Sequence, residues 1–215
     1  MELREILQHV DHTLLAPTAT WEEIQHLAEE AMEYHTASIC IPPCYIKPVK
    51  EKYGDAVNIC TVIGFPLGYS TMESKVKEAM DAVADGAREV DMVINIAKMK
   101  NHEYSEVLSE MKAIRGACEG VILKCIIETC YLTEEEKVEC CHMVTEAGID
   151  YIKTSTGFGT AGATLEDVQL FAANIGPKVK IKAAGGIRTK EFMEELLEAG
   201  ADRLGCSAAV KLAKG

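Results

Sequence analysis

The sequence predicts an α/β fold, a (β/α)8 barrel in which eight parallel strands alternate with helices. The chain of 215 residues is long enough for one large domain and short for two. Eight short apolar runs alternate with longer amphipathic runs, a pattern typical of βα units. Gly86, Gly148 and Gly200 each separate a helical run from the next strand, because glycine permits the left-handed turn that ends a helix. We therefore expect residues 1–215 to form a single barrel domain.

The expected strands are short apolar runs bounded by turn residues. They lie at about 9–15, 37–42, 57–64, 88–95, 121–128, 150–155, 179–184 and 203–207. The expected helices lie between them, at about 21–34, 44–53, 72–85, 102–118, 134–147, 165–174, 189–199 and 208–213. Thr20 and Thr133, each followed by Glu three residues later, predict capping boxes, and Thr164 and Thr189 predict two more helix starts. The alternative, an open doubly wound sheet, would have a glycine-rich turn after its first strand, and this sequence has none there.

Composition and charge restrict the class of partner. Hydrophobic residues make up 48% of the chain and charged residues 26%, which is typical of a globular protein. No apolar run approaches the roughly 20 residues of a membrane span, and the N-terminus does not resemble a signal peptide, so we expect a cytoplasmic protein. The net charge of −12 and the lack of a basic stripe argue against nucleic acid. We expect neither nucleic acid nor membrane as a partner.

The nine cysteines are expected to be reduced and to act mostly as small apolar residues. Cys40 and Cys44 have metal-like spacing but are separated by two prolines, and Cys140-Cys141-His142 lacks a second ligand pair at a suitable spacing. We therefore expect no metal site.

Lys153 and Lys182 each lie inside an otherwise apolar, strand-like run. Burying an ammonium group costs several kcal/mol, roughly, unless it is paired or loses its proton. Two ammonium groups held close together lower each other's pKa, and a free amine attacks carbonyl carbons. Alternation along the neighbouring strands places Asp11, Asp91 and Lys124 on inward faces as well, which makes five charged positions on five strands. On the same pattern, Glu89 shares a face with Asp91, and Glu128 shares a face with Lys124. The alternative is a structural layer of ion pairs, although a packed barrel interior would normally use Val, Ile or Leu at five such positions.

Glycine-rich turns near the end of the chain predict a phosphate site. Gly185 and Gly186 follow the seventh strand, and Gly205 and Ser207 lie in the eighth, where barrels of this type often bind phosphate through backbone N–H groups. The alternative is that the two adjacent glycines only make a tight turn. Residues 157–162 match the dinucleotide-binding pattern G-x-G-x-x-G, but the acidic residue expected about 20 positions later is missing. A dinucleotide is therefore disfavoured, and the backbone N–H group of Gly157 is instead expected to donate to a phosphate.

These segments together resemble the deoxyribose-phosphate aldolase family, class I aldolases that are (β/α)8 barrels. The resemblance covers nearly the whole chain and is carried by residues 38–43 (SICIPP), 89–91 (EVD), 124–128 (KCIIE), 151–157 (YIKTSTG) and 183–188 (AAGGIR). It implies that Lys153 forms the Schiff base, that Lys182 keeps this amine unprotonated, and that Asp91 moves protons through a bound water. Asp11 and Lys124 are implied as supporting members of the charged network. The residues implied to bind phosphate are Gly157, Gly185, Gly186, Arg188, Gly205 and Ser207.

The implied reaction is the reversible cleavage of 2-deoxy-D-ribose 5-phosphate to acetaldehyde and D-glyceraldehyde 3-phosphate. No cofactor is implied, and the resemblance suggests a homodimer. Three positions depart from some family members: the chain ends at Ala213-Lys214-Gly215 without a C-terminal tyrosine, and Phe158 and Ala208 replace a basic residue and a serine. Two other functions stay open, another phosphosugar barrel such as an isomerase with Asp91 as its base, and a non-catalytic sugar-phosphate sensor.

Overall fold

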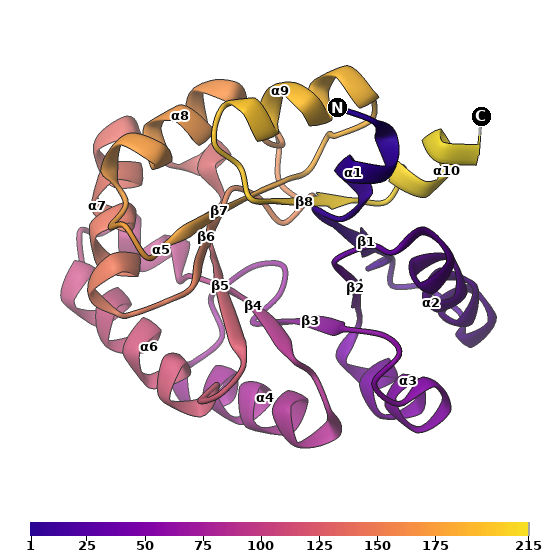
Figure 1. Cartoon of the computed structure of the whole chain (residues 1–215). Coiled ribbons are helices and arrows are strands. Elements are labelled where there is room, and N and C mark those ends of the chain that lie inside the picture. The colour runs from indigo at the N-terminus through magenta and orange to yellow at the C-terminus, as the bar shows by residue number, and fades with distance from the viewer. Residues whose placement is uncertain (215) are drawn as a thin grey trace.

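Eight parallel strands close into a barrel surrounded by helices in the computed structural model, which describes residues 1–214 (Figure 1). The strands are β1 Val10–Thr13, β2 Ser38–Ile41, β3 Ile59–Ile63, β4 Glu89–Val93, β5 Ile122–Ile126, β6 Tyr151–Lys153, β7 Lys180–Ala184 and β8 Arg203–Cys206. Each strand pairs in parallel with its neighbours in the sequence, and β8 pairs with β1 to close the ring. The predicted (β/α)8 barrel is confirmed, with strands shorter than expected by up to three residues.

The helices form the outer ring (Figure 1). They are α1 Leu3–Leu7, α2 Trp21–Tyr34, α3 Ile46–Tyr53, α4 Met72–Asp85, α5 Ile96–Lys100, α6 Tyr104–Ala117, α7 Glu134–Glu146, α8 Leu165–Asn174, α9 Lys190–Glu198 and α10 Ala209–Lys214, with 3₁₀ turns η1 Pro43–Tyr45 and η2 Thr129–Tyr131. The short helices α1 and α5 were not predicted. Asn95, expected inside the fourth strand, instead caps α5 by accepting a hydrogen bond from the backbone of Lys98.

The predicted helix starts are confirmed. Thr20 and Thr133 form capping boxes with Glu23 and Glu136, and the Thr164 and Thr189 side chains accept hydrogen bonds from the third residue of their helices. Gly86 ends α4 with a φ of 111°, as the expected left-handed turn requires. In the described part of the chain, no helix has both the length and the apolar character needed to cross a membrane.

Strand register determines which side chains enter the barrel. Parallel pairing places Asp91 opposite Lys124, and Lys153 opposite Lys182. Because paired residues on neighbouring strands point to the same face, these charged side chains share the interior. The alternate residues, such as Val90, Met92 and Ile152, are fully buried in the apolar layer between strands and helices. The barrel therefore has an apolar outer core and a charged inner one.

Candidate active site

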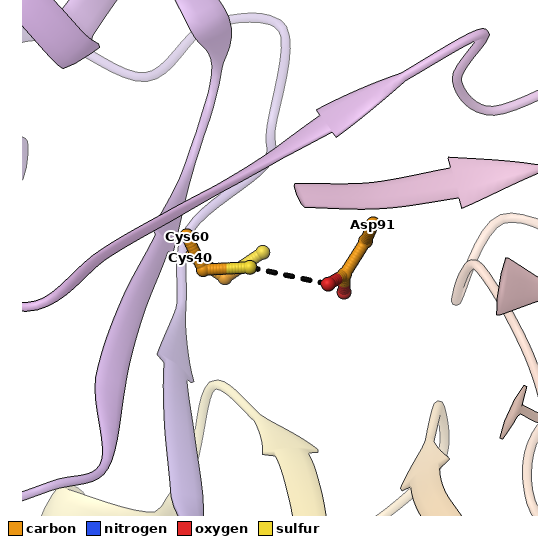
Figure 2. Close-up of side chains that lie close together, drawn as sticks. All are labelled: Cys40, Cys60 and Asp91. Atoms are coloured by element: carbon orange, nitrogen blue, oxygen red, sulfur yellow. Dashed lines mark hydrogen bonds between the residues drawn. The ribbon is translucent and has the colours of Figure 1, made fainter. Parts of the chain in front are cut away.

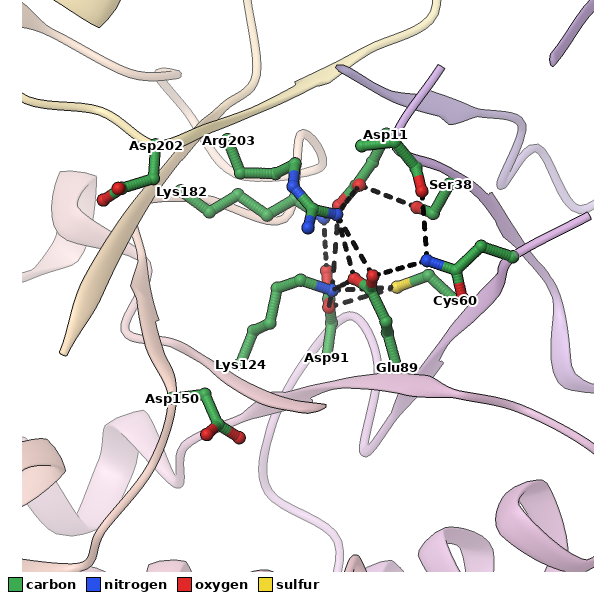
Figure 3. Close-up of polar contacts among 12 residues, drawn as sticks. Asp11, Ser38, Cys60, Glu89, Asp91, Lys124, Asp150, Lys182, Asp202 and Arg203 are labelled. Carbon is green, nitrogen blue, oxygen red and sulfur yellow. Dashed lines mark hydrogen bonds and ion pairs between the residues drawn. The ribbon is translucent and has the colours of Figure 1, made fainter. Parts of the chain in front are cut away.

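Asp91 of β4 is the centre of an ion network inside the barrel (Figure 3). Its Oδ2 atom accepts hydrogen bonds from the Nζ atoms of Lys153 and Lys182, each at 2.7 Å, and its Oδ1 atom accepts from Lys124 at 2.9 Å. The two ammonium nitrogens that share Oδ2 are thus separated by at most twice 2.7 Å. The predicted meeting of Lys153, Lys182, Asp91 and Lys124 is confirmed as a matter of geometry.

A second group of charges lies beside this centre (Figure 3). Asp11 of β1 binds Lys182 Nζ at 2.5 Å and Arg203 at 2.5 Å, and Lys124 Nζ lies 3.7 Å from it. Glu89 of β4 binds Lys124 Nζ at 2.5 Å and Arg203 at 3.0 Å. Asp11 therefore joins the network as predicted, and Arg203 and Glu89 extend it across the interior.

In this network, attraction between opposite charges changes the pKa values more than burial does. Burial alone would raise the pKa of Asp91, but the surrounding ammonium groups, Lys124 foremost, hold that pKa well below its usual range. Burial alone would lower the pKa of Lys182, but Asp11 and Asp91 raise it above its usual range. The expectation that the two lysines lower each other's pKa is therefore wrong for Lys182, because it has two carboxylate partners and stays a cation.

Lys153 differs from the other interior lysines because it reaches a cavity. Its side chain is 4% exposed, whereas those of Lys124 and Lys182 are 0% exposed. The cavity has a volume of about 560 Å³ and is lined by the loops after β1, β6, β7 and β8. Lys153 is the one lysine among the described residues that line it. Its amine therefore has a carboxylate on one side and an open space on the other.

The six residues predicted to bind phosphate all line the same cavity. They are Gly157, Gly185, Gly186, Arg188, Gly205 and Ser207. Gly185 and Gly186 adopt φ values of 86° and 74°, which glycine reaches without strain. The backbone N–H groups of these glycines, the guanidinium of Arg188 and the hydroxyl of Ser207 can donate hydrogen bonds to an anion.

Comparison with known proteins shows to which family this chain belongs. Residues 5–209 match the DeoC/LacD family aldolase model. A deoxyribose-phosphate aldolase of Clostridium botulinum is 60% identical over 215 residues, which cover 100% of this chain and 97% of the relative. The chain belongs to the DeoC/LacD aldolase family. It is therefore an aldolase, a lyase that acts on carbon–carbon bonds, and the predicted resemblance is confirmed.

Solved structures agree with this assignment. A crystal structure of a chain from Coccidioides immitis has a TM-score of 0.95 and 40% identity, and covers 100% of this chain and 86% of that one. The deoxyribose phosphate aldolase of Aeropyrum pernix, whose structure is described as tetrameric, has a TM-score of 0.92 and 31% identity over 99% of this aldolase and 91% of that chain. Both likenesses span the whole barrel and its loops.

Two residues of the aldolase network, Arg203 and Glu89, were not among the predicted site residues. Glu89 was expected to share the inward face of Asp91, and it does. Alternation could also have identified Arg203, which is two residues before Gly205. Gly205 also has a steric role beside its place at the cavity. A Cβ atom there would lie 2.8 Å from Ala184 Cβ and 3.2 Å from Lys182 Cε, so the absence of a side chain leaves room for Lys182.

Glu128 was expected on the inward face with Lys124 but lies beyond the end of β5. Its φ of 53° turns the chain out of the strand, and its carboxylate accepts hydrogen bonds from the backbone N–H and the hydroxyl of Thr156. Thr156 lines the cavity directly after β6. The neighbouring Phe158 packs edge-on against Phe65, with the ring centroids 5.4 Å apart. Glu128 therefore braces the loop that follows Lys153.

Cys40, Cys60 and Asp91 form one of two buried groups with metal-like geometry among residues 1–214 (Figure 2). The other group is Asp11, Cys60 and Glu89. Asp91 already accepts hydrogen bonds from three lysines, and Lys124 Nζ also lies 3.3 Å from Cys60 Sγ. A divalent cation placed among these ammonium groups would be repelled by them. The donor set therefore fits a lysine network better than a metal. All nine cysteines are free thiols.

Proposed function

We propose that this aldolase reversibly cleaves 2-deoxy-D-ribose 5-phosphate to acetaldehyde and D-glyceraldehyde 3-phosphate through a Schiff base on Lys153. The observation that carries the proposal is the position of Lys153, which alone among the interior lysines faces the cavity and shares an oxygen of Asp91 with a permanently charged neighbour. The names of the Clostridium botulinum and Aeropyrum pernix relatives support the substrate.

The free amine of Lys153 attacks C1 of the open-chain aldehyde and forms a carbinolamine, which loses water to give an iminium ion. The C3 hydroxyl then loses its proton, the C2–C3 bond breaks, and its electron pair moves into the iminium to form an enamine. D-glyceraldehyde 3-phosphate leaves as the C3 carbon becomes a carbonyl. Protonation of the enamine at C2 and hydrolysis then release acetaldehyde and restore the amine.

Asp91 is assigned to proton transfer during carbinolamine and iminium formation, through a bound water. Its low pKa makes it a carboxylate at neutral pH, so its negative charge also stabilises the iminium on Lys153, 2.7 Å away. Lys182 and Lys124 orient Asp91 from its other sides. Asp11 in turn holds Lys182 in place.

The substrate phosphate is assigned to the glycine-rich end of the cavity. The donors are the backbone N–H groups of Gly157, Gly185, Gly186 and Gly205, the hydroxyl of Ser207 and the guanidinium of Arg188. These residues come from the loops after β6, β7 and β8, so the phosphate would lie beside Lys153 at one end of the barrel. Phe158 lines the same cavity and contributes no charge to it.

Borohydride reduction tests the proposal. Acetaldehyde added with borohydride should increase the mass of the protein by one reduced ethyl group, and peptide mapping should place it on Lys153. A Lys153→Leu variant should gain no adduct and cleave no substrate, while its circular dichroism matches that of the wild type. Lys180→Leu, an exposed lysine on β7, is the matched control and should be trapped like the wild type. An adduct that persists in Lys153→Leu would overturn the assignment.

The same experiment separates this function from the two alternatives. An isomerase that uses Asp91 as base, or a non-catalytic sugar-phosphate sensor, would bind the phosphosugar without a covalent adduct. We further propose, as the sequence predicts, that residues 1–215 act as one domain, that the protein is cytoplasmic, and that it assembles as a homodimer. Sedimentation of the purified chain tests the last point, and the tetramer described for Aeropyrum pernix makes a larger assembly the competing outcome.

A further inference from the structure

The charged side chains that meet inside the barrel do not balance. Three carboxylates lie there, Asp11, Glu89 and Asp91, and each side chain is at most 2% exposed. Four cations face them, namely Lys124, Lys153, Lys182 and Arg203, and each side chain is at most 11% exposed. If all seven groups were ionised, the interior would carry one surplus positive charge. An uncompensated charge in such a poorly hydrated space is costly, so the network favours the loss of one proton.

Contacts decide which cation gives up its proton. Lys124 contacts three carboxylates, and Lys182 contacts two, at 2.5 and 2.7 Å. Arg203 contacts two and keeps its proton at any physiological pH. Among the described residues, Lys153 contacts a single carboxylate, Asp91, and that oxygen is shared with Lys182. Lys153 is therefore the cation whose protonated form the network stabilises least.

We propose that Arg203 is a positioning residue that sets the protonation of Lys153 from across the barrel. By supplying the third permanent cation, it neutralises the interior carboxylates and leaves the ammonium of Lys153 as the surplus charge. This inference rests on the proposed Schiff-base function, because only a nucleophilic Lys153 needs a free amine. The Arg203 guanidinium lies between Asp11 and Glu89 (Figure 3). Arg203 is not among the residues that line the cavity.

Among the described residues, no carboxylate other than Asp11, Glu89 and Asp91 forms an ion pair with the four cations of this network. Cys60 of β3 donates its S–H group to Asp91, and burial raises the pKa of this thiol. Cys40 of β2 is a buried thiol beside Cys60, and its replacement by Ser is included among the controls. Tyr151 of β6 lies with its ring centroid 5.5 Å from the Arg203 guanidinium carbon. Beyond the network, Glu128 is bound to Thr156, and Lys180 is exposed.

The test is the pH dependence of the acetaldehyde adduct trapped by borohydride and quantified by mass spectrometry. Arg203→Met leaves three carboxylates and three lysines, which balance when Lys153 is an ammonium, so Lys153 should keep its proton and the midpoint for trapping should rise by about one pH unit. Glu89→Gln adds to the cation excess, so the midpoint should fall by a similar amount. The double variant removes one charge of each sign and should return towards the wild-type midpoint.

Matched controls separate charge from loss of structure. Arg203→Lys keeps the cation and should hold the midpoint near that of the wild type. Arg88→Met removes an exposed arginine that pairs with Asp55, and should leave the midpoint unchanged. The shifts should persist when Cys40 is replaced by Ser. A purely structural role for Arg203 would move the Arg203→Met and Glu89→Gln midpoints in the same direction, and that result would overturn the proposal.

The outcomes also separate this inference from the proposed function. If the wild type forms no adduct at any pH, the Schiff-base function itself fails. If the wild type is trapped on Lys153 but neither Arg203→Met nor Glu89→Gln changes the midpoint, only the role proposed for Arg203 fails. If Arg203→Met does not fold, two other variants decide: Glu89→Gln must lower the midpoint, and Glu89→Gln combined with Arg203→Lys must lower it by the same amount.

Discussion

Lys182→Leu should make Lys153 a poorer nucleophile at neutral pH. The two Nζ atoms bind the same oxygen of Asp91 at 2.7 Å each, so they lie at most twice that distance apart. At an effective dielectric constant of about 20, two unit charges at this separation repel by about 3 kcal/mol. That energy corresponds to about two pH units in the midpoint of a titration.

A second effect of the Lys182→Leu change has the same sign. Without Lys182, the Oδ2 atom of Asp91 is left to Lys153 alone, and the interior carboxylates outnumber the remaining permanent cations, Lys124 and Arg203. Both effects favour the protonated form of Lys153. The pH midpoint for borohydride trapping should therefore rise by about two units, and the rate at neutral pH should fall by about 100-fold.

The assay compares pH profiles of trapping for the wild type, Lys182→Leu and Lys180→Leu. Lys180 is an exposed residue on the same strand, two positions earlier, and its substitution should leave the profile unchanged. Lys182→Arg retains a cation beside Asp11 and Asp91 and should shift the midpoint less than Lys182→Leu does. An unchanged midpoint in a folded Lys182→Leu protein would refute the coupling between the two lysines.

Three further substitutions test other parts of the site. Gly205→Ala places a Cβ atom 2.8 Å from Ala184 Cβ and 3.2 Å from Lys182 Cε, so it should lower the unfolding free energy by about 1–3 kcal/mol and reduce kcat, as denaturant titration and steady-state kinetics would measure. Lys75→Met leaves Glu110 buried without its partner at 2.9 Å and should cost about 3 kcal/mol of stability, part of which a second change, Glu110→Gln, should restore. Arg188→Met should raise KM for the phosphorylated sugar and leave the KM for unphosphorylated 2-deoxyribose unchanged, and equal effects on both substrates would exclude a phosphate contact.

The barrel was predictable because the turns and helix caps that separate its elements depend on local sequence. Glycine turns such as Gly86, and threonine caps such as Thr20, depend on a few neighbouring residues, so the sequence marks them directly. The helices α1 and α5 were missed because each has only five residues, too few for a periodic pattern to be recognised. Alternation along the strands placed the main charges in the interior for the same local reason.

The ion pairs that cross the barrel could not be predicted from local sequence patterns. The pairing of Arg203 with Asp11 and Glu89 joins it to residues that lie more than 100 positions earlier in the chain, and it depends on closure of the ring. The same closure gives Lys182 two carboxylate partners, which reverses the pKa shift expected from the two lysines alone. The left-handed turn at Glu128 likewise ended the alternation that was expected to bring this residue inward.

The surplus charge also predicts that catalysis and stability are opposed in this barrel. Leu at position 153 removes the cation that lacks a carboxylate of its own, while Asp91 keeps its contacts to Lys124 and Lys182. Removing one partner of a buried ion pair is destabilising when the other charge is left uncompensated, and here Asp91 stays compensated by two lysines. Lys153→Leu should therefore unfold at an equal or higher denaturant concentration than the wild type, although it is inactive. Asp91→Asn removes the shared acceptor of three lysines and should unfold at a lower concentration. A clear loss of stability in Lys153→Leu would mean that this lysine is a structural cation, and the charge count that frees its amine would be wrong.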